Sequence, residues 1–315
     1  MAAPSPFRDG FAALVHEPLL PAAELTWRWC FGLAAWILGI ASMGMFLDSL
    51  TVSPVDAFVL RTFQPQFVDG ALRHIFRGSL TRFLLMQAVL IAGVTLLWSL
   101  AATVGRAATL RRLVAMFSSD DEPQSLEWRF APIFVLQLLR AMWSLIALAV
   151  AAAMFVYGVA LAEGQHPLRG AFLLSAGSGF ALFAGAVLNW FLGVAPIFCV
   201  RDRASAMEAV MQTVDFAGRH AGRLFLLAAG FFVLRLGWAG MMCLAFLSPL
   251  NFVSGIGAGW VMCLMTGVAL VYFSGADTLY LARLAAYVAL SHDEGYTPMS
   301  EPAIPAEILP LEGLA

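Results

Sequence analysis

The chain has 315 residues, of which 61% are apolar and 12% charged, and its formal net charge is −2. Soluble domains are usually about 45–50% apolar and about 25% charged, so this composition excludes an ordinary water-soluble fold. We therefore expect an all-α, polytopic bundle of membrane helices. The near-neutral charge also argues against a nucleic-acid partner, which normally requires a basic patch.

About six transmembrane helices are predicted from the apolar runs, because about 20 residues of helix are needed to cross the hydrocarbon. The turn residues Ser248-Pro249-Leu250-Asn251 divide the longest run in two, since Pro and Asn punctuate helices. The first run is expected to be retained as a helix and not cleaved as a signal, and residues 1–28 are predicted to be a cytoplasmic N-terminal segment. The predicted spans are 29–47, 83–105, 141–162, 170–200, 223–247 and 252–281.

Two further segments are predicted to be amphipathic helices at the membrane interface. In 204–216, the residues Met207, Val210, Met211 and Val214 share one helical face. A similar stripe lies in 68–76. Each helix either covers the end of the bundle or senses lipid. Residues 291–315 contain acids and prolines but no Arg, which predicts a disordered acidic tail.

The distribution of arginines predicts the orientation in the membrane, because cytoplasmic loops are enriched in Lys and Arg. All eighteen basic residues are Arg, and more of them fall on the side of the N-terminus than on the other. Both termini are therefore predicted to be cytoplasmic. The four arginines Arg61, Arg73, Arg77 and Arg82, which follow the first span, oppose this orientation.

One charged pair is predicted inside the membrane. A charge at the bilayer centre costs about 2.5–3.5 kcal/mol, so Arg235 in the fifth span needs protein or water around it. Asp277 in the sixth span is the nearest intramembrane acid and lies at a matching height, which predicts an ion pair between the two helices. The pair would fix the register of the bundle, or it would line a path for a substrate or ion. A third alternative is that Arg235 has no partner and extends toward the membrane surface.

Four other polar residues are predicted at or near membrane depth: Gln87, Gln137, Arg140 and Asn189. Hydrogen bonds between membrane helices contribute about 0.6–2 kcal/mol, so these residues either hold helices together or line a transport path. Small residues four apart, such as Ala35 and Gly39 or Ala181 and Gly185, would permit close helix packing.

Catalytic and cofactor motifs are not found, so we expect neither an enzyme nor a bound cofactor. The sequence contains no GxSxG, HExxH or GxxxxGK[ST] motif. Its four Cys lie in apolar segments without a CxxC pair, and its five His are scattered among loops. No metal site is predicted.

One stretch resembles a known family. Ala195-Pro196, Val200-Arg201-Asp202, Glu208-Ala209-Val210 and Gly222-Arg223-Leu224-Phe225 occur in an order similar to that in the membrane domain of glycerophosphoryl diester phosphodiesterases. Other segments, such as Asp48–Pro54, resemble an uncharacterised bacterial inner-membrane family. The resemblance implies a six-helix domain in a bacterial cytoplasmic membrane. It does not imply phosphodiesterase activity, because the catalytic domain that accompanies some relatives is absent from this sequence.

The sequence thus predicts a non-enzymatic component of a membrane that organises partners or lipids. The expected partners are membrane lipids and a membrane protein. The alternative is a transporter or permease-like subunit that moves a small solute or lipid.

Overall fold

The structure is a computed structural model, and it describes residues 5–61, 65–117, 128–164, 167–248 and 257–292. Every element in these ranges is helical, which confirms the all-α prediction. The loop 118–127 and the predicted tail beyond residue 292 lie outside the described residues. Six described segments are long and apolar enough to cross a membrane: Leu19–Asp48, Leu80–Phe117, Phe130–Ala162, Pro167–Arg201, Ala221–Leu247 and Gly259–Ser291.

The chain forms two compact units. Unit 1 is Met1–Pro18, Leu110–Glu127 and Ile197–Ala315, and unit 2 is Leu19–Thr109 and Trp128–Pro196. Two helices, α5 (Leu80–Phe117) and α9 (Pro196–Arg201), continue from one unit into the other.

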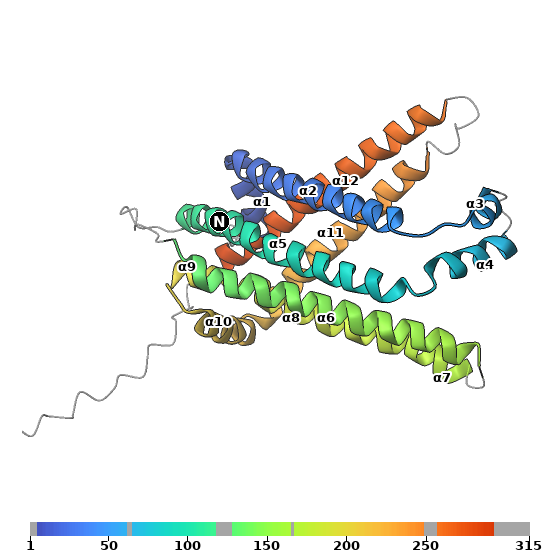
Figure 1. Cartoon of the computed structure of the whole chain (residues 1–315). Helices are drawn as coiled ribbons and strands as arrows, with labels where there is room; N and C mark the ends of the chain where they lie inside the picture. The colour runs from blue at the N-terminus through green and yellow to red at the C-terminus, as the bar shows by residue number, and fades with distance from the viewer. Residues whose placement is uncertain (1–4, 62–64, 118–127, 165–166, 249–256, 293–315) are drawn as a thin grey trace, which may run out of the picture. The chain divides into compact units, whose positions relative to one another are not determined.

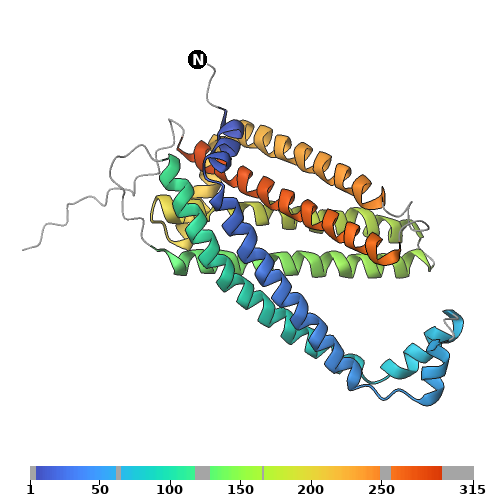
Figure 2. The ribbon, with the colours of Figure 1, turned by 90° about the horizontal axis from the view of Figure 1, so that it is seen from above.

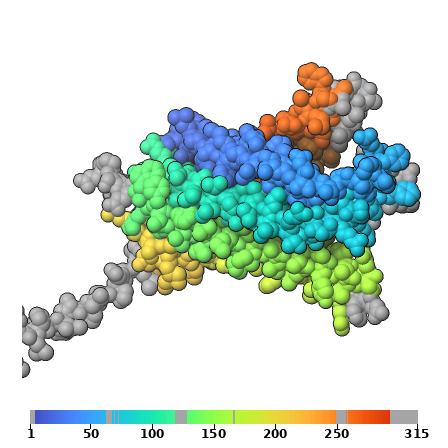
Figure 3. Space-filling view, in the orientation of Figure 1, coloured from blue at the N-terminus to red at the C-terminus, as the bar shows by residue number. Residues whose placement is uncertain are grey.

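In unit 2, the long helices α2 (Leu19–Asp48) and α5 lie side by side along much of their length (Figures 1 and 2). Aromatic side chains fill the space between them, with ring centroids 5.2 Å apart for Trp27 and Trp98 and 5.0 Å apart for Phe46 and Phe83. Figure 3 shows the side chains of the two helices, blue and teal, in continuous contact. In lipid, where burial of apolar surface gives no hydrophobic gain, close packing of such rings attracts the two helices.

The rest of the membrane-spanning part of unit 2 is a helical hairpin. Helix α6 (Phe130–Ala162) packs on the segment formed by α7 (Pro167–Phe172), the π-helix η1 (Leu173–Gly177) and α8 (Ser178–Val194). A Cβ atom at Gly185 would lie 2.5 Å from Cβ of Ala147. Gly185, one of the small residues predicted to allow close packing, therefore lets α8 approach α6. By contrast, Gly39 and Gly179 face open space.

Two short helices of unit 2, α3 (Pro54–Arg61) and α4 (Pro65–Phe76), follow α2. The Ser53 hydroxyl accepts a hydrogen bond from the backbone N–H of Asp56 at 3.1 Å and donates to its carboxylate at 2.7 Å. His74 on α4 contacts the same carboxylate at 2.9 Å, which joins the two helices. The Ser53 hydrogen bond, with a smaller contribution from His74, lowers the pKa of Asp56.

Unit 1 is built on a hairpin of α11 (Ala221–Leu247) and α12 (Ala258–Ser291), which lie side by side in both ribbon views (Figures 1 and 2). The indole of Trp238 packs on Gly275 and donates a hydrogen bond to the backbone oxygen of Tyr272 at 3.1 Å. Near the C-terminal end of α12, α1 (Pro6–His16) packs on this helix. The rings of Phe7 and Phe11 lie 4.8 and 5.7 Å from that of Phe231.

The predicted interfacial segment 204–216 falls within helix α10 (Ala206–Arg219) of unit 1. Ser205 and Glu208 form a capping box at its start, which satisfies two backbone N–H groups. Its buried residues are Ala209, Thr213 and Phe216, whereas Met207 and Met211 are 70% and 62% exposed. The stripe predicted from the sequence is therefore the outer face of the helix, and a second face anchors the helix to the unit.

The helices extend beyond the predicted apolar spans. Helix α5 has 38 residues, against a predicted span of 83–105, and α2 begins at Leu19 instead of 29. A helix satisfies its own backbone hydrogen bonds, so it continues past the hydrocarbon until the sequence breaks it. The fifth helix ends at Leu247, where the predicted span also ends.

Candidate functional site

Arg235 lies near the middle of α11. It is 14 residues after Ala221 and 12 before Leu247, or about 21 and 18 Å from the two ends at about 1.5 Å per residue. Its side chain is exposed, and no hydrogen bond or ion pair joins it to any of the described residues. A guanidinium at the centre of a bilayer costs about 2.5–3.5 kcal/mol unless protein or water surrounds it.

The predicted partner Asp277 is half-buried on α12. The contact of Trp238 with Tyr272 and Gly275 fixes the register of the hairpin and brings Asp277 to about the level of Arg235. No ion pair within 4.0 Å joins the two side chains in the described part of the chain, and Asp277 has other interactions. The structure thus matches their levels without joining them, and the pairing stays a prediction.

Two of the other predicted polar residues do meet. The guanidinium of Arg140 on α6 donates a hydrogen bond to the side-chain oxygen of Asn189 on α8, within unit 2. Gln137 lies one turn before Arg140 and is buried, 6% exposed. The contact of Arg140 with Asn189 connects two spanning helices, whereas Gln87 is half-buried on another helix, α5.

Another polar cluster in unit 2 is absent from the predictions. Glu24 on α2 is 2% exposed, and its carboxylate accepts hydrogen bonds from Trp27 Nε1 at 3.1 Å and from Arg28 Nε at 3.0 Å. Thr109 Oγ1 on α5 donates to the same carboxylate at 2.7 Å, and the buried Arg106 attracts it. A Cβ at Gly105 would lie 2.5 Å from the Trp27 ring, so the glycine permits this approach of α5. The cluster fastens α2 to α5.

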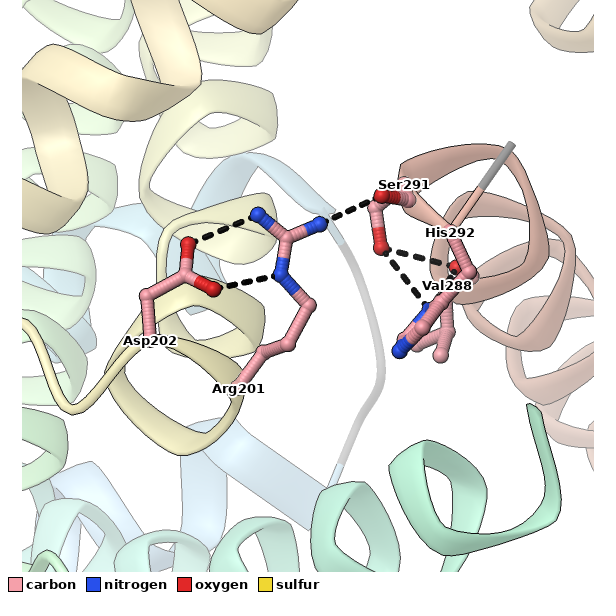
Figure 4. A network of polar contacts seen from close by, with 5 residues as sticks. All are labelled: Arg201, Asp202, Val288, Ser291 and His292. Atoms are coloured by element: carbon pink, nitrogen blue, oxygen red, sulfur yellow. Dashed lines mark hydrogen bonds and ion pairs between the residues drawn. The ribbon is translucent and has the colours of Figure 1, made fainter. Parts of the chain in front are cut away.

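A further polar cluster joins the ends of α9 and α12 in unit 1 (Figure 4). Arg201 forms two hydrogen bonds with the carboxylate of Asp202, from Nε at 2.6 Å and from Nη2 at 2.7 Å, and a third with the backbone oxygen of Ser291. His292 Nδ1 lies 2.9 Å from the backbone oxygen of Val288, so this nitrogen carries the proton. The cluster caps the C-terminal end of α12.

His292 follows the last spanning residue, and burial lowers its pKa, with a further lowering by the charge of Arg201. Below about pH 6.5, His292 therefore takes up a proton more readily in the unfolded chain than in the folded protein. The free energy of unfolding falls with acidification as a result. We expect His292→Gln to weaken this dependence between pH 8 and pH 5, measured by unfolding in mixed micelles. An unchanged slope in the variant would contradict this account.

Residues for metal binding or covalent chemistry do not cluster in the described ranges. No group of three His, Cys, Asp or Glu side chains is placed to hold a metal ion there. All four cysteines are free thiols, and Cys199 alone among them is buried. The candidate functional site is therefore Arg235, which lies exposed in the middle of the spanning helix α11.

The fold and the distribution of apolar side chains define a multi-pass membrane protein. No family model, curated protein or solved structure matches this chain. The resemblance of residues 195–225 to the membrane domain of glycerophosphoryl diester phosphodiesterases stays a prediction.

Proposed function

We propose that this protein is a non-enzymatic component of a bacterial cytoplasmic membrane that organises a partner protein within the bilayer. The supporting observation is the exposed guanidinium of Arg235 in the middle of α11. A charge in that position costs about 2.5–3.5 kcal/mol unless a polar group covers it. A partner that supplies this group turns a destabilising residue into a specific contact.

A native mass-spectrometry experiment tests the proposal on protein extracted in its own membrane as lipid discs. We expect a second protein at fixed stoichiometry with this chain, retained when the lipid-to-polymer ratio of the discs is varied. An unrelated six-helix protein, extracted in the same way, is the control. Discs that contain this chain with lipids alone would contradict the proposal.

A transporter is the second candidate, and the supporting observation is the polar group of Gln137, Arg140 and Asn189 in unit 2. Polar side chains at membrane depth line the pathways of many transporters. A small solute retained in the same discs, and lost in the Arg140→Leu variant, would favour this function over the first.

A further inference from the structure

Arg235 lies far from the lipid headgroups. The hydrocarbon core is about 30 Å thick, and α11 places Arg235 about 18 Å or more from both of its ends. Arginines near the ends of a membrane helix extend along the surface to reach the headgroups. From the middle of the helix the side chain meets headgroups or water only if the bilayer thins or water enters it.

The other spans of this chain do not supply a counter-charge at this depth. Within the six spanning segments the acidic residues are Glu24, Asp48 and Asp277. Glu24 lies in the second turn of α2 and is bonded to Arg28 and Thr109, while Asp48 is the last residue of that helix. Asp277 is not joined to Arg235 by an ion pair in the described residues. In the described residues the guanidinium of Arg235 is therefore open to an anion from outside the chain.

The surroundings of Arg235 suit a helix as the source of the anion. Phe232 lies one turn before Arg235, and Leu236 and Cys243 follow Phe232 by four and eleven residues; all three are exposed. Residues at i, i+4 and i+11 form a continuous stripe along one side of a helix. Phe231 and Trp238, in contrast, are occupied by α1 and α12. An apolar stripe beside one cation matches an apolar helix with one acid.

We infer that α11 binds a transmembrane helix of a partner protein that carries a carboxylate at the middle of the bilayer, opposite Arg235. This inference rests on the proposed function and specifies the chemistry of the partner. Two buried opposite charges with good geometry compensate for each other's loss of water, whereas either one alone is costly. The contact is therefore selective for an acid over its amide.

A designed peptide tests the inference without knowledge of the natural partner. The probe is a Leu/Ala transmembrane peptide of about 23 residues with one Asp at its centre, and its match has Asn there. Energy transfer between the labelled peptide and the full-length protein in phosphatidylcholine discs measures binding. We expect the Asp peptide to bind about tenfold more tightly than the Asn peptide, a difference of about 1.4 kcal/mol.

Variants of the protein decide which residue is responsible. Arg235→Leu, which makes the span more apolar, should remove the preference, and Arg61→Leu on α3 should leave it intact. Moving the Asp seven residues along the peptide, about 10 Å, should also remove it. Equal binding of the two peptides, or a preference that survives in Arg235→Leu, would overturn the inference.

Asp277→Asn tests whether the acid within the chain competes. We expect the preference to stay within about twofold, since Arg235 is open to the partner. A tenfold gain of this preference in the Asp277→Asn variant would mean that Asp277 pairs with Arg235 in the unmodified protein, and would overturn the inference. If the peptide result fails while native discs retain a partner, the proposed function survives without the inference. If the discs contain no partner while the peptide preference holds, the proposed function fails alone.

Discussion

Replacing Glu24 by alanine should lower the free energy of unfolding by about 3–5 kcal/mol, the range found when one partner of a buried ion pair is removed. Glu24 is 2% exposed and the Arg28 side chain 19% exposed. Without the carboxylate, Arg28 and the buried Arg106 lose their common counter-charge, and Trp27 and Thr109 lose an acceptor. Unfolding in mixed micelles, followed by tryptophan fluorescence, measures the loss.

Glu17→Ala is the matched control for this experiment. Glu17 forms an ion pair with Arg112, but their side chains are 25% and 61% exposed. Solvent screens such a pair, so its loss should cost about 0–1 kcal/mol. Equal effects of the two alanine variants would show that burial of the Glu24 cluster contributes nothing to stability.

Substitution of Gly10 by alanine should release α1 from α12. The added Cβ would lie 2.5 Å from the backbone oxygen of Ala282 and 2.9 Å from Cβ of Ala286, and a backbone atom cannot move aside cheaply. Overpacking of this kind costs about 1–3 kcal/mol. We expect faster hydrogen–deuterium exchange at Pro6–His16, by roughly five- to 150-fold if the cost appears entirely as local opening.

Gly218→Ala provides the comparison, because a Cβ at Gly218 in α10 meets nothing within 4 Å. There the change should stabilise its helix by about 0.5–1 kcal/mol, since alanine loses less conformational freedom on folding. Unchanged exchange in α1 of the Gly10→Ala variant would mean that its close approach to α12 does not hold the helix in place.

The polar clusters differ in how far the sequence revealed them. Arg140 and Asn189 were predicted because polar residues stand out in an apolar run, and the structure joins them. Glu24 and Arg28 also have helical i, i+4 spacing, but they precede the predicted first span and were assigned to the N-terminal segment. Thr109 lies 85 residues further along the chain, so its contact with Glu24 leaves no local pattern.

The fold class followed from the sequence alone. Lipid offers no hydrogen bonds to a backbone, so six long apolar runs must form helices whatever their neighbours do. The helix at 204–216 could also be predicted from the sequence, because helical periodicity is a property of consecutive residues.

Only the tertiary structure decided which polar groups meet. Matching heights made Arg235 and Asp277 candidates, but a pair also depends on how far each helix is rotated about its axis. That rotation is set by large and small side chains such as Trp238 on Gly275 and Phe7 on Phe231. In a chain so rich in apolar residues, many rotations bury similar area, so composition and spacing cannot select one. Specific packing does, and it leaves Arg235 on the surface of its unit.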